Sequence, residues 1–301
     1  MDTKPLKLFL SLSETLHFGR TSALCHVSPS TLSRTIKQIE DQLGTTLFYR
    51  DNRSVKLTPE GVLFQNYARD TLQRWESLQN SLLAESNELQ GEISLYCSVT
   101  ASYSFLYEIL NRFRRQYPKI EIKLHTGDPA HAVQRVQREV EDIAIGARPD
   151  QLASDIAFRP ITISPLVFIG PAQDQTMTQD LSGLADASHW SQIPMILSEE
   201  GLARKRTDQW FRTLGIKPLI YAQVAGNEAI VSMVSLGFGI GIVPLIVLEN
   251  SPLADRVHIL SVTPELPPFE VGLFALEKKL KSPLIQAFWS ESAPEPTVLP
   301  G

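Results

Sequence analysis

The sequence predicts an α/β protein with a separate, mainly helical N-terminal segment. Three observations support this prediction. Residues 6–43 carry apolar residues at helical spacing, residues 59–88 carry one long apolar seam, and from Gly91 onward short apolar runs alternate with amphipathic helical segments. Such alternation is typical of a largely parallel sheet with helices on both faces. The chain has 301 residues, which is enough for two or three domains.

Composition and charge are those of an ordinary globular protein. Apolar residues make up 43% of the chain, charged residues 20%, and the net charge is −5, which argues against a basic protein that coats nucleic acid. Residues 1–60 nevertheless hold eight Lys/Arg against six Asp/Glu, a net of +2 that leaves −7 for the remainder. A mildly basic N-terminal segment followed by an acidic remainder fits local contact with DNA.

No metal or cofactor site is expected. Cys25 and Cys97 lie far apart in no metal-binding or redox spacing, and the six histidines include no HxxxH pair. Free thiols indicate a reducing, cytoplasmic environment, and the first five residues do not predict a signal peptide. The uncharged residues 229–248 could be read as a membrane span. Because glycine and proline interrupt them, we interpret them as a buried helix, a turn and a buried strand.

Three short helices are predicted at the N-terminus. The first covers residues 6–16, and residues 18–40 form two helices joined by a tight turn. Ser28 is the N-cap candidate of the third helix, and Pro29 occupies its first position, where a missing N–H costs nothing. Gly44 is a suitable stop. The apolar face of this third helix consists of Leu32, Ile36, Ile39 and Leu43.

The opposite face of the third helix carries hydroxyl groups and cations, which suits the major groove of DNA. Taken alone, it could equally be an amphipathic surface helix. Residues 47–50 and 55–58 flank a polar turn and predict a hairpin, or wing, whose arginines we expect to touch phosphates rather than only solvent. The residues expected to contact DNA are Arg20, Ser28, Ser30, Thr31, Ser33, Arg34, Gln38, Arg50 and Arg53.

A long linker helix is predicted after the wing, with Thr58 as its N-cap and Pro59 at its first position. Its apolar residues follow a heptad spacing, which is typical of a coiled-coil contact. The alternative is a helix packed on its own domain. A dimer would present two recognition helices to a palindromic site. The residues of the expected dimer seam are Phe64, Ala68, Thr71, Trp75, Leu78 and Leu82.

The remaining chain predicts the α/β body. Strands are expected at residues 92–97, 120–125, 143–146, 166–169, 195–197, 220–224, 239–243 and 269–276. Helices are expected at residues 103–116, 129–139 and 280–290. Residues 293–301 contain three prolines and no apolar stripe, so we expect a disordered tail.

The order of these parts resembles the LysR-type transcriptional regulators, along essentially the whole chain. The motifs that carry the resemblance are Phe18-Gly19-Arg20, Val27-Ser28, residues 32–40, Leu43-Gly44 and residues 47–50. The resemblance implies a winged helix-turn-helix domain at residues 1–58, a dimerising linker at 59–90 and a periplasmic-binding-protein-like effector domain at 91–292. Its first subdomain would span about residues 91–163 and 267–292, and its second about 164–266. Double-stranded DNA, RNA polymerase and further copies of the chain, as a dimer or tetramer, are the partners implied.

One position departs from the family pattern. Many members carry a glutamine that reads base edges just after the N-cap of the recognition helix, whereas this chain has Pro29. Proline offers no side-chain donor. Base readout must therefore shift to neighbours such as Ser30, Thr31, Ser33, Arg34 or Gln38.

Within the family, residues 27–34, 50–53, 97–101 and 227–234 resemble a regulator of isoleucine–valine synthesis. This resemblance implies activation of the acetohydroxy acid isomeroreductase gene in response to acetolactate or acetohydroxybutyrate. The alternative is a LysR-type regulator of another operon that senses a different small organic anion.

A small carboxylate effector needs clustered donors and an apolar wall. In α/β sheets such ligands bind at the carboxyl ends of strands, where this chain places hydroxyl-rich loops, residues 98–102 above all. Each of these residues could instead be a helix cap. The effector-binding candidates are Ser98, Val99, Thr100, Ser102, Thr126, Gly127, Ser198, Arg204 and Asn227.

An enzyme is not expected. Ser98, His125 and Asp128 could be assembled into a nucleophile set, but no glycine-flanked serine elbow accompanies them. The remaining alternative is a solute-binding module or enzyme that carries a helical extension.

Overall fold

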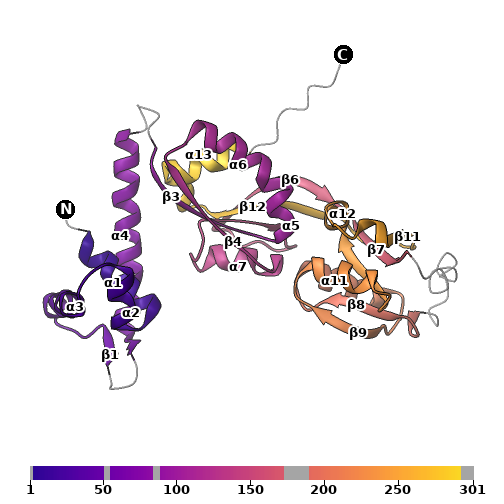
Figure 1. The fold of residues 1–301 in the computed structure, drawn as a ribbon, viewed down its shortest axis with the longest axis horizontal. Coiled ribbons are helices and arrows are strands. Elements are labelled where there is room, and N and C mark those ends of the chain that lie inside the picture. Colours follow the sequence, from indigo (N-terminus) through magenta and orange to yellow (C-terminus); the bar gives the residue numbers. More distant parts are fainter. Residues whose placement is uncertain (1–2, 51–54, 84–88, 173–189, 293–301) are drawn as a thin grey trace, which may run out of the picture. The chain divides into compact units, whose positions relative to one another are not determined.

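The computed structural model describes residues 3–50, 55–83, 89–172 and 190–292. The chain separates into two compact units, Met1–Glu85 and Ser86–Gly301, called here the head and the body (Figure 1). Arg53 and the expected tail at residues 293–301 lie outside the described residues.

The head is a winged helix-turn-helix. Its elements are α1 (Lys4–Thr15), α2 (Phe18–Leu24), α3 (Pro29–Leu43), the antiparallel strands β1 (Phe48–Arg50) and β2 (Val55–Leu57), and α4 (Pro59–Leu83). Ser28 caps α3 by accepting a hydrogen bond from the Thr31 amide at 3.1 Å, and Gly44 ends it at φ 69°. The predicted apolar face is confirmed, because Leu32 and Ile36 are fully buried in the core of the head.

Helix α4 divides its apolar residues between two environments. Ala68 is fully buried in the core of the head, and the Phe64 ring packs edge-on against Phe9 at 4.7 Å between centroids. These two residues therefore stabilise the head itself, which corrects their placement in the dimer seam. Leu82, in contrast, is 74% exposed, and Leu78 is exposed as well.

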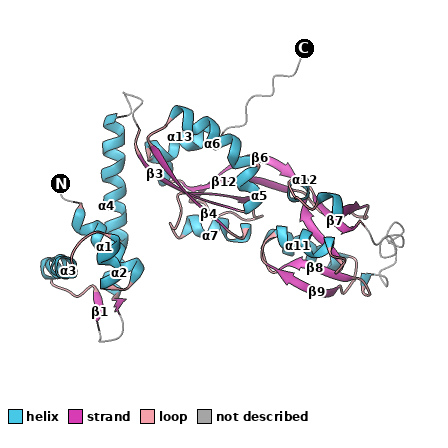
Figure 2. Ribbon diagram, viewed as in Figure 1, coloured by secondary structure: helices cyan, strands magenta, loops and turns pink. Residues whose placement is uncertain are grey.

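The described part of the body contains two five-stranded mixed sheets with the same arrangement (Figure 2). The first has the order β4-β3-β5-β12-β6 and the second β9-β8-β10-β7-β11. In each sheet the first three strands are parallel to one another and the last two pair antiparallel. The strands of the first sheet are β3 (Gly91–Cys97), β4 (Ile120–Thr126), β5 (Ile143–Ala147), β6 (Ile156–Ser164) and β12 (Phe269–Leu276). Those of the second are β7 (Leu166–Pro171), β8 (Pro194–Ser198), β9 (Leu219–Val224), β10 (Ile240–Pro244) and β11 (Val257–Leu260).

Two predictions about the sheets need correction. The sheet expected to be largely parallel is instead two mixed sheets, and strands β6 and β11 were not predicted. Both missed strands lie at the edge of a sheet, where each pairs antiparallel with one neighbour that is distant in sequence. The chain crosses from the first subdomain to the second at Pro165 and returns through residues 261–268.

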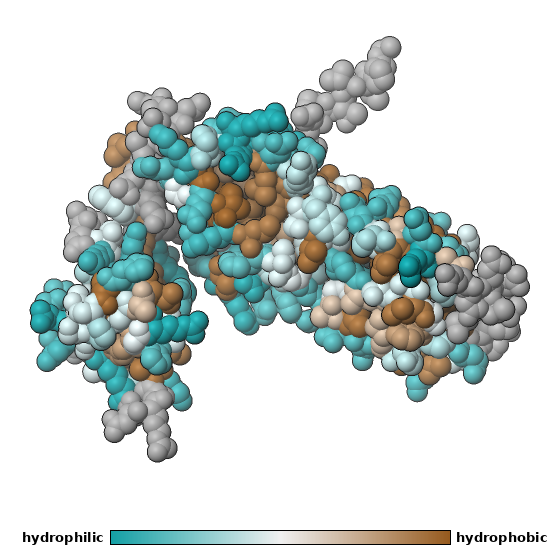
Figure 3. Space-filling model, in the orientation of Figure 1, coloured by the Kyte–Doolittle hydropathy of each residue, from teal (hydrophilic) through white to brown (hydrophobic). Residues whose placement is uncertain are grey.

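Helices cover both faces of both sheets. On the first sheet, α6 (Phe105–Gln116) and α13 (Pro283–Glu291) meet on one face, where the Phe113 and Phe288 rings lie 5.0 Å apart. On its other face lies α7 (Ala132–Gln137). On the second sheet, α10 (Gly201–Thr213) and α11 (Asn227–Ser235) contribute to separate apolar clusters on opposite faces. On the surface of the body, exposed apolar residues (brown) lie beside hydrophilic residues (teal) (Figure 3).

Two predicted helices differ in detail, and one predicted segment gains a helix. The helix expected at 103–116 is α6, which begins at Phe105, and a short helix that was not predicted, α5 (Val99–Tyr103), precedes it. The helix expected at 129–139 is a 3-10 turn, η2 (Pro129–His131), followed by α7. Residues 229–248 contain the predicted helix (α11), turn and strand (β10), followed by a short helix, α12 (Leu245–Glu249), that was not predicted. No helix in the described ranges has the length and apolar character needed to cross a membrane.

Candidate nucleic-acid interface and ligand cleft

The free face of α3 is exposed and polar. The side chains of Ser30, Thr31, Ser33, Arg34 and Gln38 all lie at the surface. Ser28 differs from them because its hydroxyl caps the helix and also lies 2.9 Å from the Ser30 hydroxyl and 2.8 Å from that of Thr31. The start of α3 therefore presents clustered hydroxyl groups with Arg34 one turn further on.

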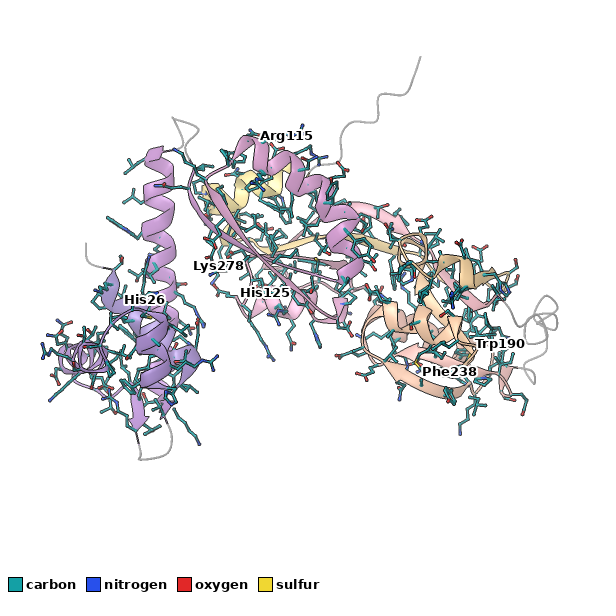
Figure 4. The ribbon with its side chains drawn as sticks, viewed as in Figure 1. His26, Arg115, His125, Trp190, Phe238 and Lys278 are labelled. Carbon is teal, nitrogen blue, oxygen red and sulfur yellow. The ribbon has the colours of Figure 1, made fainter. Side chains whose placement is uncertain are left out.

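The turn before α3 holds the two helices of the motif in place. His26 adopts the left-handed conformation, with φ 51°, in the turn between α2 and α3 (Figure 4). Arg20 lies exposed on α2, and its amide donates a hydrogen bond to His17 Nδ1 at 3.1 Å, which caps that helix.

Arg50 serves the fold as well as the surface. Its guanidinium contacts Glu40 Oε2 at 2.6 Å and lies over the Phe18 ring at 5.3 Å. Glu40 Oε1 also accepts a hydrogen bond from the Leu47 amide at 2.8 Å. Arg50 thus fastens the wing to α2 and α3, a role that the sequence did not predict for it.

A cleft of about 860 Å³ lies between the two subdomains of the body. The first subdomain lines it with Asp128, η2, α7 and residues 147–153, and the second with Ser198, the start of α10, Gly226 and Asn227. Ser198 and Asn227 are the predicted effector-binding residues that lie in this lining.

The two subdomains touch at one rim of the cleft. Gly201 has φ 90°, and a Cβ added there would come within 2.9 Å of the Ala130 Cβ. Beside this contact, His131 Nε2 lies 2.8 Å from Glu200 Oε1.

The start of α10 faces the cleft without a side-chain cap. Glu200 occupies the N-cap position but makes no capping hydrogen bond, and the first three residues of α10 all line the cleft. First-turn amides have no partner within their own helix and carry the positive end of its dipole. Among the described lining residues Lys205 supplies the cation, and it was not among the predicted effector-binding residues.

Arg204, predicted instead of Lys205, is used elsewhere. Its guanidinium donates to the Ser198 carbonyl at 3.0 Å, to Asp208 at 2.9 Å and to the Gln223 side chain. It therefore ties α10 to the ends of β8 and β9. The spacing of Arg204 and Asp208, four residues apart on a helix, was the signal for this role.

The loop at residues 98–102 does not belong to the cleft lining found in the described chain. Ser98 caps α5 by accepting from the Ala101 amide at 3.1 Å, and the Ser102 hydroxyl donates to the Val99 carbonyl at 2.6 Å. Thr100 is only 2% exposed, and its amide and hydroxyl both donate to Glu228 Oε1, at 2.9 and 2.6 Å. The donors expected to hold an effector therefore bind groups of the protein.

The loop after β4 is fixed by a close contact. A Cβ added at Gly127 would lie 2.5 Å from the Tyr96 hydroxyl, which donates to the Asp128 carbonyl at 2.8 Å. Thr126, just before it, is exposed. The catalytic set considered above does not assemble, because His125 contacts Glu141 at 3.1 Å. Within the described ranges no cluster of metal-ligating side chains occurs.

Comparison with known families identifies the chain. Residues 3–62 match the family described as "Bacterial regulatory helix-turn-helix protein, lysR family", and residues 86–294 match "LysR substrate binding domain". The protein belongs to the LysR family of transcriptional regulators. Its assignment as a regulator rather than an enzyme, and the predicted fold, follow from this membership.

Two curated relatives match nearly the whole chain. The "HTH-type transcriptional activator IlvY" of Haemophilus influenzae is 44% identical over 291 residues, which cover 96% of this chain and 99% of that protein. The "HTH-type transcriptional regulator IlvY" of Escherichia coli is 44% identical over 292 residues, which cover 96% and 98%. The resemblance of shorter stretches to one regulator of isoleucine–valine synthesis thus extends over the full length.

Solved structures share the fold at lower identity. A full-length OxyR variant from Pseudomonas aeruginosa superposes with a TM-score of 0.68 at 21% identity, covering 97% of this chain and 94% of that one. Full-length CbnR in complex with its target DNA gives 0.64 at 19%, with coverage of 97% and 100%. The effector-binding domain of QuiR in complex with shikimate gives 0.56 at 22%, with coverage of 67% and 95%.

Cys97 ends β3 next to the capped loop and is fully buried. Burial raises the pKa of its thiol to about 12, because the apolar surroundings disfavour the thiolate. At neutral pH the side chain therefore behaves as a small apolar residue.

We expect the Cys97 thiol of a Cys25→Ser variant to resist iodoacetamide between pH 7 and about pH 10, because the thiolate is the reactive form. In denaturant the same thiol should react readily above its ordinary pKa of about 8.5. The unfolded chain releases this proton earlier, so raising the pH above that value lowers the free energy of unfolding. Mass spectrometry of alkylated protein measures both states, and rapid labelling of the folded variant at pH 8 would contradict the pKa shift.

Proposed function

We propose that the protein is a cytoplasmic activator of the acetohydroxy acid isomeroreductase gene, controlled by acetolactate or acetohydroxybutyrate. The observation that carries this proposal is the 44–45% identity, over 96% of the chain, to relatives named as IlvY regulators. The alternative is a regulator of the same family that senses a different small organic anion.

The head supports sequence-specific binding of double-stranded DNA. A polar, exposed face on α3 is suited to the major groove, and Arg34 projects from this face where a guanidinium can pair with guanine. We propose that Arg34 and its hydroxyl neighbours read bases, since Pro29 has no donor. RNA polymerase is the further partner proposed for an activator.

We propose that α4 forms the dimer. Among the α4 side chains that the structure describes, the exposed apolar ones are Val62, Leu63, Tyr67, Leu78 and Leu82. The last four recur at intervals that keep them on one side of the helix, separate from the side that Ala68 buries. Leu63 and Tyr67 were absent from the predicted seam. A homodimer would carry two recognition helices to a palindromic operator, and a homotetramer is the larger assembly proposed.

The cleft supports binding of a small monocarboxylate. We propose that its carboxylate binds the uncapped start of α10 with Lys205 as counter-ion. Leu202, Val133 and Phe269 supply apolar wall. Ser198 and Asn227 offer polar groups for the tertiary hydroxyl and the ketone, whose pairing would distinguish acetolactate from simpler acids.

Replacing Arg34 by alanine should weaken operator binding by about 1–3 kcal/mol, because a bidentate base contact is lost. Binding to unrelated DNA should change less. Arg115→Ala, which removes an exposed arginine from α6 of the body (Figure 4), is the matched control. Fluorescence anisotropy with operator and scrambled duplexes measures the effect. Equal losses of affinity for both duplexes would assign Arg34 to phosphate contact. The same test applies to Arg53, which lies outside the described residues.

The double variant Leu78→Asp, Leu82→Asp should be monomeric at micromolar concentration, because two charges would have to be buried in the helix contact. Operator binding should fall with the loss of the second recognition helix. Leu236→Asp, an equally exposed leucine of the body, should leave the mass unchanged. Light scattering reports the assembly, and a dimeric double variant would show that the subunits meet elsewhere.

Lys205→Ala should weaken binding of acetolactate by about 1.5–3 kcal/mol, because a hydrogen bond to a charged group is lost. Operator affinity without effector should be unaffected, since the head is a separate compact unit. Lys217→Ala removes an exposed lysine outside the cleft and serves as control. Titration calorimetry with freshly prepared acetolactate gives the affinities. Equal affinity in both variants would reject this placement of the carboxylate.

A further inference from the structure

We infer that Glu228 determines the charge class of ligand that the cleft accepts. Its fixed carboxylate selects ligands with one carboxylate and rejects otherwise similar ligands with two. This inference rests on the proposed function, because it refines the ligand of the same cleft.

The Glu228 carboxylate is held in place by the other subdomain. Thr100 is 2% exposed, and its amide and hydroxyl donate to Glu228 Oε1 at 2.9 and 2.6 Å. Hydrogen bonds to an ionised acceptor are short and strong. The two bonds fix the position of a negative charge that would otherwise move with a flexible side chain.

That charge lies beside the cleft. Glu228 directly follows Gly226 and Asn227, which both line the cleft. Its second oxygen, Oε2, turns back towards Gly226, where an added Cβ would lie 3.4 Å from it. One carboxylate oxygen is therefore engaged by Thr100, while the other lies against a residue of the cleft wall.

The charges of the cleft lining leave no counter-ion for a second ligand carboxylate. In the described lining, the acidic side chains are Asp128, Asp150 and Glu200, and Lys205 is the cation. Asp128 caps Ala130 at 2.9 Å, Glu200 contacts His131 at 2.8 Å, and Asp150 lies 3.9 Å from Arg206. Lys205 can neutralise one carboxylate. A second carboxylate near Gly226 and Asn227 would have the Glu228 charge directly behind this part of the cleft wall, where repulsion between like charges is weakly screened.

The selectivity therefore comes from repulsion of the wrong ligand as well as from attraction of the right one. Thr100, which holds the Glu228 carboxylate, has no donor left to bind the ligand itself. Thr100 uses both of its donors on Glu228, so residues 98–102 support the cleft by holding this charge.

The test replaces Glu228 by glutamine, which keeps an oxygen acceptor for Thr100 and removes the charge. The probes are acetolactate and 2-hydroxy-2-methylmalonate, which has the same branched skeleton with a carboxylate in place of the acetyl group. Calorimetry on the full chain at pH 7.5 should show that the unaltered protein binds the dicarboxylate at least about tenfold more weakly than acetolactate. Glu228→Gln should raise the affinity for the dicarboxylate about tenfold.

Two further variants control for charge and for position. Glu228→Asp retains the charge and should retain the rejection. Glu249→Gln removes an exposed carboxylate at the end of α12 and should change neither affinity. If the glutamine variant melts at a much lower temperature, the comparison of both probes on the unaltered protein and on Glu228→Asp still tests the inference.

The outcomes separate this inference from the proposed function. Stronger binding of the dicarboxylate to folded Glu228→Gln, but not to Glu249→Gln, supports the inference whether or not acetolactate binds. Unchanged binding of the dicarboxylate, or equal binding of both probes to the unaltered protein, overturns it. Failure of acetolactate to bind the unaltered protein would contradict the proposed effector alone.

Discussion

The chain crosses twice between the sheets of the body, and the cleft depends on this constraint. The chain leaves the first sheet at Pro165 and returns to it through residues 261–268. Strand β12 of the first sheet therefore follows all strands of the second sheet in sequence. Each sheet keeps three parallel strands, so that its loops gather at one edge. The loops after β4, β5, β8 and β9 all contribute residues to the cleft. Two similar halves therefore present their ligand-binding edges to the same space.

Much of this arrangement could be predicted from the sequence because parallel strands are separated by helices. The alternation after Gly91 identified the strands that carry the cleft loops, and with them Ser198 and Asn227. Strands β6 and β11 were not predicted because each pairs at the edge of its sheet with a strand distant in sequence, and local spacing does not reveal such a partner. The spacing of Arg204 and Asp208 indicated an ion pair within one helix. Lys205 could not be selected from the sequence, because the residue at which α10 begins decides which side of the helix faces the cleft.

The contact between Thr100 and Glu228 was beyond sequence reasoning for a different reason. The residues are 128 positions apart, and each has an ordinary local interpretation, one in a hydroxyl-rich loop and the other as an acid in the first turn of a helix. Similarly, Arg50 is predicted to contact phosphate, and its sequence position does not reveal that Glu40, ten residues earlier, binds it. In both pairs the fold supplies a partner that spacing does not reveal. In α4 the heptad spacing was real, but it could not show that Phe64 and Ala68 turn inward.

The rim contact between Gly201 and Ala130 has a consequence for how this type of cleft can change. Because a Cβ at position 201 would come within 2.9 Å of the Ala130 methyl, the absence of one methyl group allows the two subdomains to approach so closely. Any other residue at this position would act as a wedge and would also have to adopt an unfavourable φ. A side chain at position 201 would therefore separate the two subdomains at this rim, and it would do so at the same helix start that we propose to hold the ligand carboxylate.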